Sequence, residues 1–182
     1  IESFQDEKAQ ELLCNLKFKK DSLLHFQSEI LISKIFIKQK NYKLAEEILL
    51  ELRKIFSKQK ILYLNLSDLY FKSKELEKGI SILKEGIVNF PKFIPLRFNL
   101  AIMYRNLGLI ELSIKTHIEI LLVDKFNSNS FYELSTMYDF ASHDQLLKTL
   151  LNCEIENLSP KEKIYLGYSK AIFDLTTSFV HA

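Results

Sequence analysis

The side chains that most often carry out catalysis are scattered along this 182-residue chain. Its histidines are His25, His117, His143 and His181, and no two of them stand at a spacing that binds a metal ion. The sequence has no nucleophile elbow and no glycine-rich phosphate loop. We therefore predict no catalytic residue, no cofactor and no metal site, and we expect the chain not to be an enzyme.

His117 and the two cysteines suit structural roles. Cys14 and Cys153 belong to no CxxC or Cys/His cluster, and each lies among apolar residues at helical spacing. A small buried side chain explains them better than metal or redox chemistry does. His117 falls on the inner face of a predicted helix pair, where a hydrogen-bonded histidine in or near the core is favoured over a general base.

The charge is small and unevenly spread. The chain has 25 basic and 23 acidic side chains, and its net charge is +2. Residues 1–120 carry 20 basic and 15 acidic side chains, whereas residues 121–182 carry 5 and 8. No concentrated basic patch favours nucleic acid. Most of the tyrosines and phenylalanines fall at helix-packing positions, which favours core filling over a stacking platform for single strands, so we expect no nucleic-acid partner.

Location and fold class follow from equally simple features. No apolar run approaches the length that spans a bilayer, so we predict no membrane segment. No secretory signal is visible, and a cytoplasmic location is the default. With four glycines and three prolines, the sequence leaves little room for a turn-rich β architecture.

The strongest pattern is a repeat with a period of 34 residues. Tyr63, Leu66 and Tyr70 recur at helical spacing, and a second apolar helical face ends before Pro91. The positions of Leu66, Tyr70, Gly79, Leu83 and Gly86 are matched one period earlier by Ile32, Phe36, Ala45, Leu49 and Leu52, one period later by Leu100, Tyr104, Ser113, His117 and Ile120, and two periods later by Leu134, Tyr138, Leu147, Leu151 and Glu154.

This register predicts helical hairpins within a single domain that spans residues 1–182. We expect about ten helices, each of roughly 12–15 residues, as two-helix units of this length require. The full units occupy residues 26–59, 60–93, 94–127 and 128–161. Tyr70 and Tyr104 are expected to be buried between helices.

Partial units are expected at both ends. Residues 1–25 hold a lone second helix with leucines on one face, and residues 162–182 open a further unit. Ser159 is the predicted N-cap of that unit, Pro160 takes the first helical position, and Glu162 completes a capping box. Because one repeat cannot bury its apolar face alone, we expect the chain to be a piece of a larger protein.

The pattern resembles the tetratricopeptide repeat family. Residues 60–93 carry the aromatic, leucine and small positions of its motif in order, as Tyr63, Leu66, Ser67, Tyr70, Gly79, Leu83, Gly86 and Pro91. The resemblance covers nearly the whole chain, but Leu147 stands where the family has a small residue and His117 where it has an aromatic one. It implies an all-α fold, a right-handed superhelical solenoid of TPR-like helical hairpins. The first helices of the hairpins would line a concave groove that binds proteins.

The resemblance also assigns groove-facing positions on each first helix. The candidate peptide-binding residues are Lys34, Lys38, Leu64, Asn65, Asp68, Phe71, Lys72, Phe98, Asn99, Ile102, Arg105, Tyr132 and Glu133. Asn65 and Asn99 hold the same position in consecutive units, where several family members bind a peptide backbone through asparagine. One amide both donates and accepts hydrogen bonds, so it can pair with any main chain. The alternative interpretation is two solvated asparagines. The family's clamp for a C-terminal carboxylate is not reproduced, because Ile30 and Pro95 stand where its lysines fall.

A second resemblance concerns residues 158–175. Bacterial proteins that join tetratricopeptide repeats to a sulfotransferase domain carry a similar stretch after their last full repeat. The matching residues are Leu158, Ser159, Lys161, Glu162, Lys163, Leu166, Gly167, Lys170, Ala171, Asp174 and Leu175. This resemblance would place the catalytic domain outside the chain, so it assigns no catalytic residue here.

Two classes of function remain. The first is a scaffold that binds a protein or peptide in the concave groove, with the acidic part of the ligand toward the N-terminal units. The second is a structural scaffold that forms a homodimer through its open terminal helices. A third alternative is part of a sulfotransferase-type enzyme whose catalytic domain is missing.

Overall fold

The structure, a computed structural model, describes most of the chain. The described residues are 18–137 and 158–180, with side chains up to Ile172, together with Lys8, Glu11, Lys148, Thr149 and Asn152. Every regular element in this part is an α-helix, and no strand occurs in it. The chain divides into two compact units, residues 1–99 and residues 100–182. The predicted all-α solenoid of helical repeats is confirmed.

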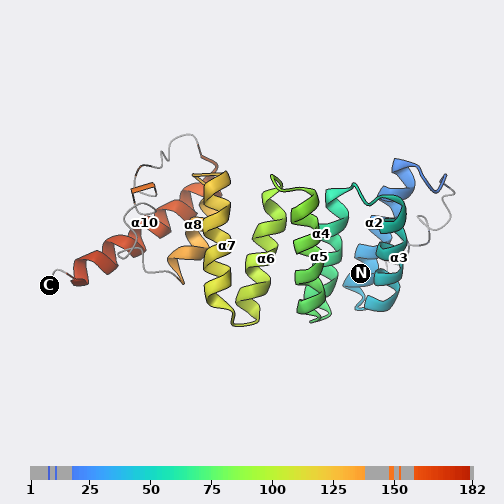
Figure 1. Cartoon of the computed structure of the whole chain (residues 1–182), viewed down its shortest axis with the longest axis horizontal. Coiled ribbons are helices and arrows are strands. Elements are labelled where there is room, and N and C mark those ends of the chain that lie inside the picture. The colour runs from blue at the N-terminus through green and yellow to red at the C-terminus, as the bar shows by residue number, and fades with distance from the viewer. Residues whose placement is uncertain are drawn as a thin grey trace. The chain divides into compact units, whose positions relative to one another are not determined.

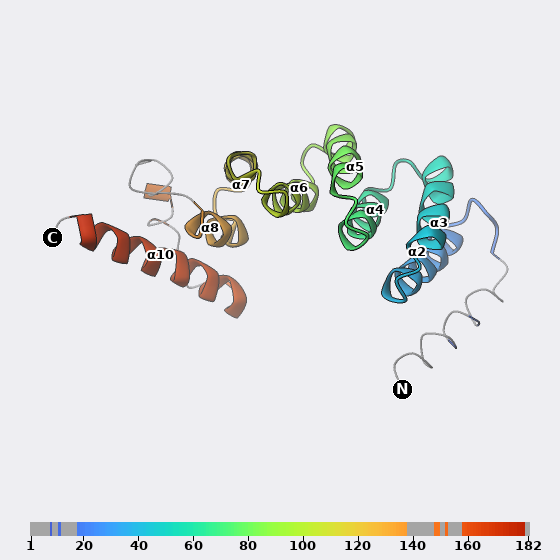
Figure 2. The same cartoon turned by 90° about the horizontal axis from the view of Figure 1, so that it is seen from below.

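The first unit is built from helical hairpins (Figure 1). Its helices are α2 (Leu23–Lys38), α3 (Tyr42–Ile55), α4 (Lys60–Lys72), α5 (Leu76–Asn89) and the start of α6 (Ile94–Asn106). Helix α2 packs on α3 and α4 on α5, while α3 and α2 both contact α4. Figure 2 shows α2 and α4 on one side of this unit and α3 and α5 on the other. The first helices of the two hairpins therefore share a face.

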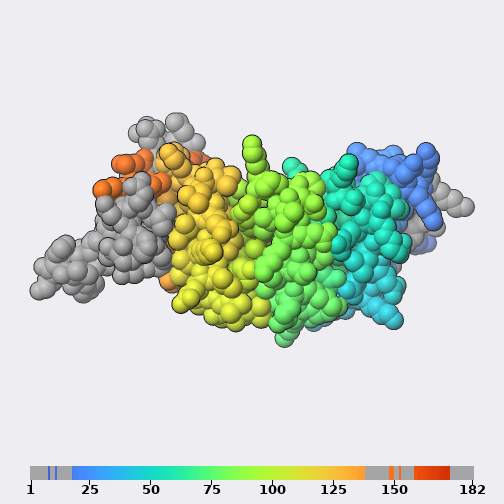
Figure 3. All heavy atoms as spheres, viewed as in Figure 1, coloured from blue at the N-terminus to red at the C-terminus, as the bar shows by residue number. Residues whose placement is uncertain are grey.

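Side chains fill the space between the helices of the first unit. Figure 3 shows continuous packing where its helices, coloured cyan to green, meet on the visible face. The core contains Leu62, Leu66 and Leu83, none of which is exposed. Tyr70 is 4% exposed, and in the second unit Tyr104 is 8% exposed. The predicted burial of both tyrosines is confirmed.

The second unit contains the rest of α6 with α7 (Ile110–Val123), α8 (Ser128–Ser135) and α10 (Pro160–Val180). Helix α8 packs against both α7 and α10. A buried cluster joins the three helices through Leu121, Phe131, Leu134 and Leu166, with Ile114, Ile118 and Leu158 packed around it.

The turn inside each hairpin has the same form at intervals of 34 residues. Lys40, Lys74 and Gly108 adopt left-handed backbone conformations, with φ of 61°, 64° and 74°. The next residue in each turn donates its N–H to the carbonyl five positions back: Asn41 to Phe36 at 2.8 Å, Glu75 to Tyr70 at 2.8 Å and Leu109 to Tyr104 at 2.9 Å. These bonds are those of a Schellman motif, which satisfies the last carbonyls of a helix. The backbone thus repeats in the register that the side chains predict.

Gly86 allows a close approach between α5 and its neighbours. A Cβ atom at this position would lie 3.0 Å from Cγ of Tyr63 on α4 and 3.1 Å from Cδ1 of Leu96 on α6. Tyr63 is 1% exposed and Leu96 is fully buried. The small residue of the repeat motif therefore makes room for a tyrosine.

The predicted helix lengths hold for α3 to α7 and are wrong for three others. Helix α2 has 16 residues, and it starts at Leu23 because Ser22 caps it by accepting a hydrogen bond from the N–H of His25 at 3.1 Å. Helix α8 has only eight residues. At its end, Ser135 and Thr136 donate their hydroxyls to the carbonyls of Tyr132 and Glu133, at 2.7 and 2.8 Å. Bonds of this kind also occur inside α2 and α4, so they do not by themselves end a helix.

Helix α10 has 21 residues, well beyond the predicted length. Its start is as predicted, because the capping box forms. The N–H of Ser159 donates to Oε2 of Glu162 at 2.9 Å, and the N–H of Glu162 donates to Oγ of Ser159 at 3.4 Å. The predicted second helices at residues 1–25 and within 128–161 fall largely outside the described residues, as do both cysteines, His143 and His181.

Candidate functional site

The predicted binding residues of the first unit lie on α2, α4 and the start of α6. Their exposed members are Lys34, Lys38, Phe71 and Lys72, and their half-buried members are Leu64, Asp68, Phe98 and Asn99. Asn65 is buried. The other four predicted residues, Ile102, Arg105, Tyr132 and Glu133, belong to the second unit.

Asn65 faces the interior more than the solvent. Its side chain is 6% exposed. Nδ2 donates a hydrogen bond of 2.8 Å to the carbonyl of Ile61, one turn earlier in α4. Part of the hydrogen-bonding capacity of this amide is therefore used inside its own helix.

Asn99 links α6 to α4. Its Nδ2 donates to Oγ of Ser67 at 3.3 Å, and the Ser67 hydroxyl donates to the carbonyl of Leu64 at 2.8 Å. The two asparagines do occupy matching positions of successive first helices, but both have partners within the protein. The interpretation as two solvated asparagines does not describe them, and neither amide is wholly free for a ligand.

Charged candidates also pair with one another. Nζ of Lys72 lies 3.0 Å from Oδ2 of Asp68, one turn apart on α4. In the second unit the Arg105 guanidinium binds the Glu133 carboxylate, which joins α6 to α8. These side chains are partly exposed, so each pair contributes little to stability, about 0–1 kcal/mol. The pairing reduces the charge that Lys72 and Arg105 present to a ligand.

An apolar opening on the first-helix face lies between the beginnings of α2 and α4. It is a hollow of about 470 Å³, hereafter the α2–α4 hollow, and it is lined by Leu23, Phe26, Gln27, Ile30, Leu31, Gln59 and Ile61. Leu23, Leu31 and Ile61 are 58%, 50% and 42% exposed. The repeat register places Gln27, Ile30, Leu31 and Ile61 at groove-facing positions, but they were not among the predicted binding residues. The signal was present, because apolar side chains take groove-facing positions in two successive units.

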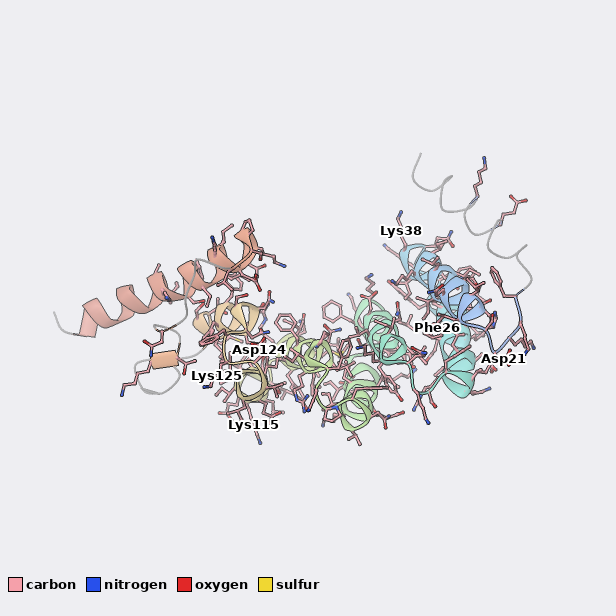
Figure 4. All side chains as sticks on the ribbon, turned by 90° about the horizontal axis from the view of Figure 1, so that it is seen from above. Asp21, Phe26, Lys38, Lys115, Asp124 and Lys125 are labelled. Atoms are coloured by element: carbon pink, nitrogen blue, oxygen red, sulfur yellow. The ribbon has the colours of Figure 1, made fainter. Side chains whose placement is uncertain are left out.

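Rigid packing forms the floor of the α2–α4 hollow. Phe26 is 5% exposed, and its ring lies 5.0 Å from that of Phe56, which follows α3. Ile30 is 6% exposed. Helix α2 thus contributes the buried Phe26 and Ile30 to the floor of the hollow and the exposed Leu31 to its rim. Figure 4 shows Phe26 and Lys38 toward opposite ends of α2.

Tyr132 belongs to an aromatic group in the second unit. Its ring stacks on Tyr165 of α10 at 4.6 Å between centroids, and Tyr168 lies 5.2 Å from it. The ammonium group of Lys161 lies 5.2 Å from the centroid of the Tyr165 ring. Tyr132 therefore fastens α8 to α10, and within this group the 44% exposed Tyr168 offers an aromatic surface to solvent.

His117 is a core histidine, as predicted. It is fully buried, and its Nδ1 lies 3.3 Å from Oγ of the equally buried Ser130. Burial, and to a lesser extent the positive charge of Arg105, lowers the pKa of His117 to about 4. The ring is therefore neutral at physiological pH and has no access to a substrate.

Within the described ranges, no three His, Cys, Asp or Glu side chains are placed to hold a metal ion together. No helix among these residues is both long enough and apolar enough to cross a bilayer.

Comparison with known proteins finds similar structures but no match in sequence. No family model matches the chain, and no curated protein matches it in sequence. It is similar in structure to YrrB, described as a TPR protein with an unusual peptide-binding site, at a TM-score of 0.59 and 12% identity over 96% of this chain and 84% of the other. It is similar to MamA from Desulfovibrio magneticus RS-1, at 0.59 and 13% identity over 79% of each chain. A third similar structure is TTC0263, a thermophilic TPR protein of Thermus thermophilus, at 0.54 and 16% identity over 79% and 80%.

Proposed function

We propose that this chain, whose fold is that of tetratricopeptide repeat proteins, is a protein-interaction module. It would bind an extended segment of a partner on the face that α2, α4 and the start of α6 share in the first unit. The fold supports this proposal, since one protein of similar structure is described as having a peptide-binding site. The matching positions of Asn65 and Asn99 support it in part, because each amide is already hydrogen-bonded.

The observation that carries the proposal is the apolar surface left open on the first helices. Leu31, Ile61 and Phe71 are 50%, 42% and 38% exposed. Their neighbours on the same helices include the exposed Lys34 and Lys72. Apolar patches rimmed by polar side chains are typical of surfaces that bind other proteins.

The test is to select binding peptides from a displayed random library and to map them by hydrogen exchange. We expect selected peptides to protect backbone amides of α2 and α4 more than those of α3 and α5. Protection confined to α3, α5 or the second unit would contradict the proposed surface.

A double variant tests the asparagines within this surface. Asn65→Ala with Asn99→Ala should weaken the selected peptides, while the free energy of unfolding falls by only about 1–2 kcal/mol, since each change removes one neutral hydrogen bond. Ser33→Ala, which removes one fully buried hydrogen bond of α2 without changing the exposed surface, is the control for a general loss of stability. If affinity is unchanged in the double variant, the two amides are bystanders.

Self-association is a second candidate, favoured by one observation on α10. Ile164 and Tyr168 are 67% and 44% exposed on this helix. A homodimer through α10 would cover them. Sedimentation at rising concentration should then show a dimer that Ile164→Gln abolishes and that Lys163→Gln leaves intact. The link to a sulfotransferase rests on the pattern of residues 158–175 and stays a prediction.

A further inference from the structure

We infer that the α2–α4 hollow is the anchoring subsite of this surface, and that its ligand is a segment with a large apolar residue next to acidic residues. The inference rests on the proposed function and adds to it the place of the anchor and the chemistry of the partner. It also adds Gln27 and Gln59 to Asn65 and Asn99 as side chains that contact the main chain of the ligand.

The first step concerns the capacity of the hollow. Its volume of about 470 Å³ lies within the range of roughly 300–1,000 Å³ that is typical of ligand pockets. The three exposed apolar members of its lining, Leu23, Leu31 and Ile61, come from two different helices. A leucine or phenylalanine side chain placed between them would cover apolar surface on both sides. The buried ring of Phe26 closes the floor, so the anchor is held without rearrangement of the core.

The second step concerns the polar groups of the lining. Gln27 and Gln59 are its two amides, one from α2 and one from the N-cap position of α4. Gln27 is exposed, and the Gln59 side chain makes no capping bond to its helix. An amide can donate to a ligand carbonyl and accept from a ligand N–H. The hollow therefore offers main-chain contacts beside the apolar anchor, whereas the Nδ2 groups of Asn65 and Asn99 already donate to protein oxygens.

The third step concerns charge along α2. Lys34 and Lys38 are exposed and follow Leu31 at spacings of three and seven residues, so they lie on the same stripe of the helix. At a rise of about 1.5 Å per residue, they lie roughly 4.5 and 10.5 Å further along. An extended ligand covers about 3.3 Å per residue. Acidic side chains within about three residues of the anchor would therefore meet these lysines.

The acidic side chains of α2 and α4 are Glu29 and Asp68. Glu29 lines a separate hollow between α2 and α3. Asp68 of α4 is neutralised by Lys72 at 3.0 Å. The exposed Lys34 therefore favours an acidic side chain next to the apolar anchor, and a basic ligand residue at that place would be repelled.

The test uses a phage-displayed library of random dodecapeptides, selected on the full chain at low salt. We expect enrichment of peptides with leucine or phenylalanine and at least two Asp or Glu within three residues of it. Synthetic fluorescein-labelled copies of the enriched peptides are then titrated by anisotropy. Replacing their apolar anchor by Ala, or their acidic residues by Lys, should weaken binding at least tenfold.

Matched variants locate the site. Leu31→Gln with Ile61→Gln should weaken binding at least tenfold, and Lys34→Gln with Lys38→Gln at least fivefold. The controls remove equal groups elsewhere on the first unit: Leu44→Gln with Val88→Gln, and Lys43→Gln with Lys54→Gln. All these positions are at least 40% exposed or lie on exposed helix faces, so the variants should fold. Circular dichroism of each variant tests that it does.

The outcomes separate this inference from the proposed function. In one outcome, peptides bind the Leu31→Gln, Ile61→Gln protein with the affinity of the parent and yet lose affinity for the Asn65/Asn99 double variant. That result would overturn the inference and leave the proposed function standing. Enriched peptides without acidic residues would overturn the predicted ligand chemistry. A concentration-dependent dimer that Leu31→Gln with Ile61→Gln abolishes would show that a second copy covers the hollow and would overturn the inference. If no peptide is enriched, both fail.

Discussion

At the scale of single residues, Tyr70 joins two hairpins through different parts of its side chain. Its ring is buried among the helices of the first unit, and its hydroxyl donates a hydrogen bond of 2.8 Å to Oε1 of Glu46 on α3. Lys78 on α5 lies 5.5 Å from the centroid of the ring and 3.5 Å from the same carboxylate oxygen. One side chain therefore connects α3, α4 and α5.

Replacing Tyr70 by Ala should lower the free energy of unfolding by about 3–5 kcal/mol, the usual cost of truncating a buried aromatic residue. Tyr70→Phe keeps the ring and should cost about 1–3 kcal/mol, because it removes a hydrogen bond to a charged group. Urea denaturation measures both values. A loss of only about 0.5 kcal/mol for the Ala variant, typical of surface positions, would contradict the packing described here.

His117 makes stability depend on pH. Its pKa is about 4 in the folded protein and about 6.5 in an unfolded chain. The unfolded state therefore binds a proton first as the pH falls, and stability is lost between about pH 6.5 and 4. The difference of about 2.5 units corresponds to about 3 kcal/mol. Other groups also titrate in this window, so a comparison with a variant is needed.

Leucine is the natural replacement, since Leu49 and Leu83 take the place of His117 in the two preceding units. In His117→Leu, the loss of stability from pH 7 to pH 4 should be smaller than in the parent by about 3 kcal/mol. Denaturation at a series of pH values gives this difference directly. Equal slopes for the two proteins would mean that folding does not lower the pKa of His117.

The two asparagines show what a sequence cannot decide at this scale. The repeat register placed Asn65 and Asn99 at the same position of successive helices, and the structure agrees. Register does not determine whether an amide bonds to Ile61 or to a ligand, since that depends on local rotamers and on Ser67. Register also assigned Gln27, Ile30, Leu31 and Ile61 to groove-facing positions, but it did not predict the α2–α4 hollow itself, because Leu23 and Gln59 of the lining lie outside those positions.

At the scale of elements, the hairpin turns follow directly from the period. Lys40 and Lys74 adopt the left-handed conformation that Gly108 adopts in the third turn. A side chain is strained in this region, whereas glycine is not. Because the strain occurs in the folded state, the two lysines cost stability that the equivalent glycine does not.

Lys74→Gly should therefore stabilise the protein by up to about 1 kcal/mol, although the greater freedom of glycine in the unfolded chain offsets part of this gain. Lys40→Gly should behave in the same way, and Gly108→Ala should destabilise by a similar amount. Thermal denaturation ranks the three variants. A destabilised Lys74→Gly protein would show that the lysine side chain has a stabilising role that outweighs its backbone strain.

The second half of the chain departs from the predicted helix lengths. Helix α8 has only eight residues and ends at Ser135. Helix α10 begins at its capping box as expected but continues past the place of a turn. It also packs differently, since Leu166 is buried while Tyr168, one period after Leu134, is 44% exposed. The spacing of apolar residues alone does not determine where these two helices end or which of their residues are buried.

Contact between α4 and α5 leads to a prediction for Gly86→Ala. Alanine in a helix interior is favoured over glycine by about 1 kcal/mol. Here its Cβ would lie about 3 Å from Cγ and Cβ of Tyr63, atoms that move only if the helix moves. We expect a net destabilisation of about 1–2 kcal/mol, as overpacking commonly costs. Tyr63→Leu in the same protein should remove part of this cost, and a double-mutant cycle measures the coupling. Additive effects would contradict the close approach.

At the scale of the whole molecule, charge divides along the same line as the two compact units. Residues 1–99 carry 18 basic and 13 acidic side chains, and residues 100–182 carry 7 and 10. The proposed acidic ligand would therefore meet a basic unit. Such long-range attraction is screened over about 10 Å at 0.1 M salt, so it affects association rates more than affinity.

Stability should also be distributed unevenly between the units. In repeat proteins each segment is stabilised mainly by its neighbours in the chain. Tyr70→Ala should therefore increase hydrogen exchange in α3, α4 and α5 strongly, and in α10 by less than about a tenth as much. Mass spectrometry of exchanged peptides resolves the helices. A uniform increase would mean that the two units unfold as one cooperative body.

The pairing of Tyr63 with Gly86 has a consequence for how this gene can change. Both partners lie inside residues 60–93, one period of the repeat, so an unequal crossover that deletes or duplicates this segment moves them together. After a deletion, Leu96 would occupy the place of Leu62, and both are buried leucines. The chain could therefore lose or gain this repeat without leaving a glycine gap or a misplaced tyrosine. The length of the chain is thus open to recombination, while Tyr63 and Gly86 are inherited together.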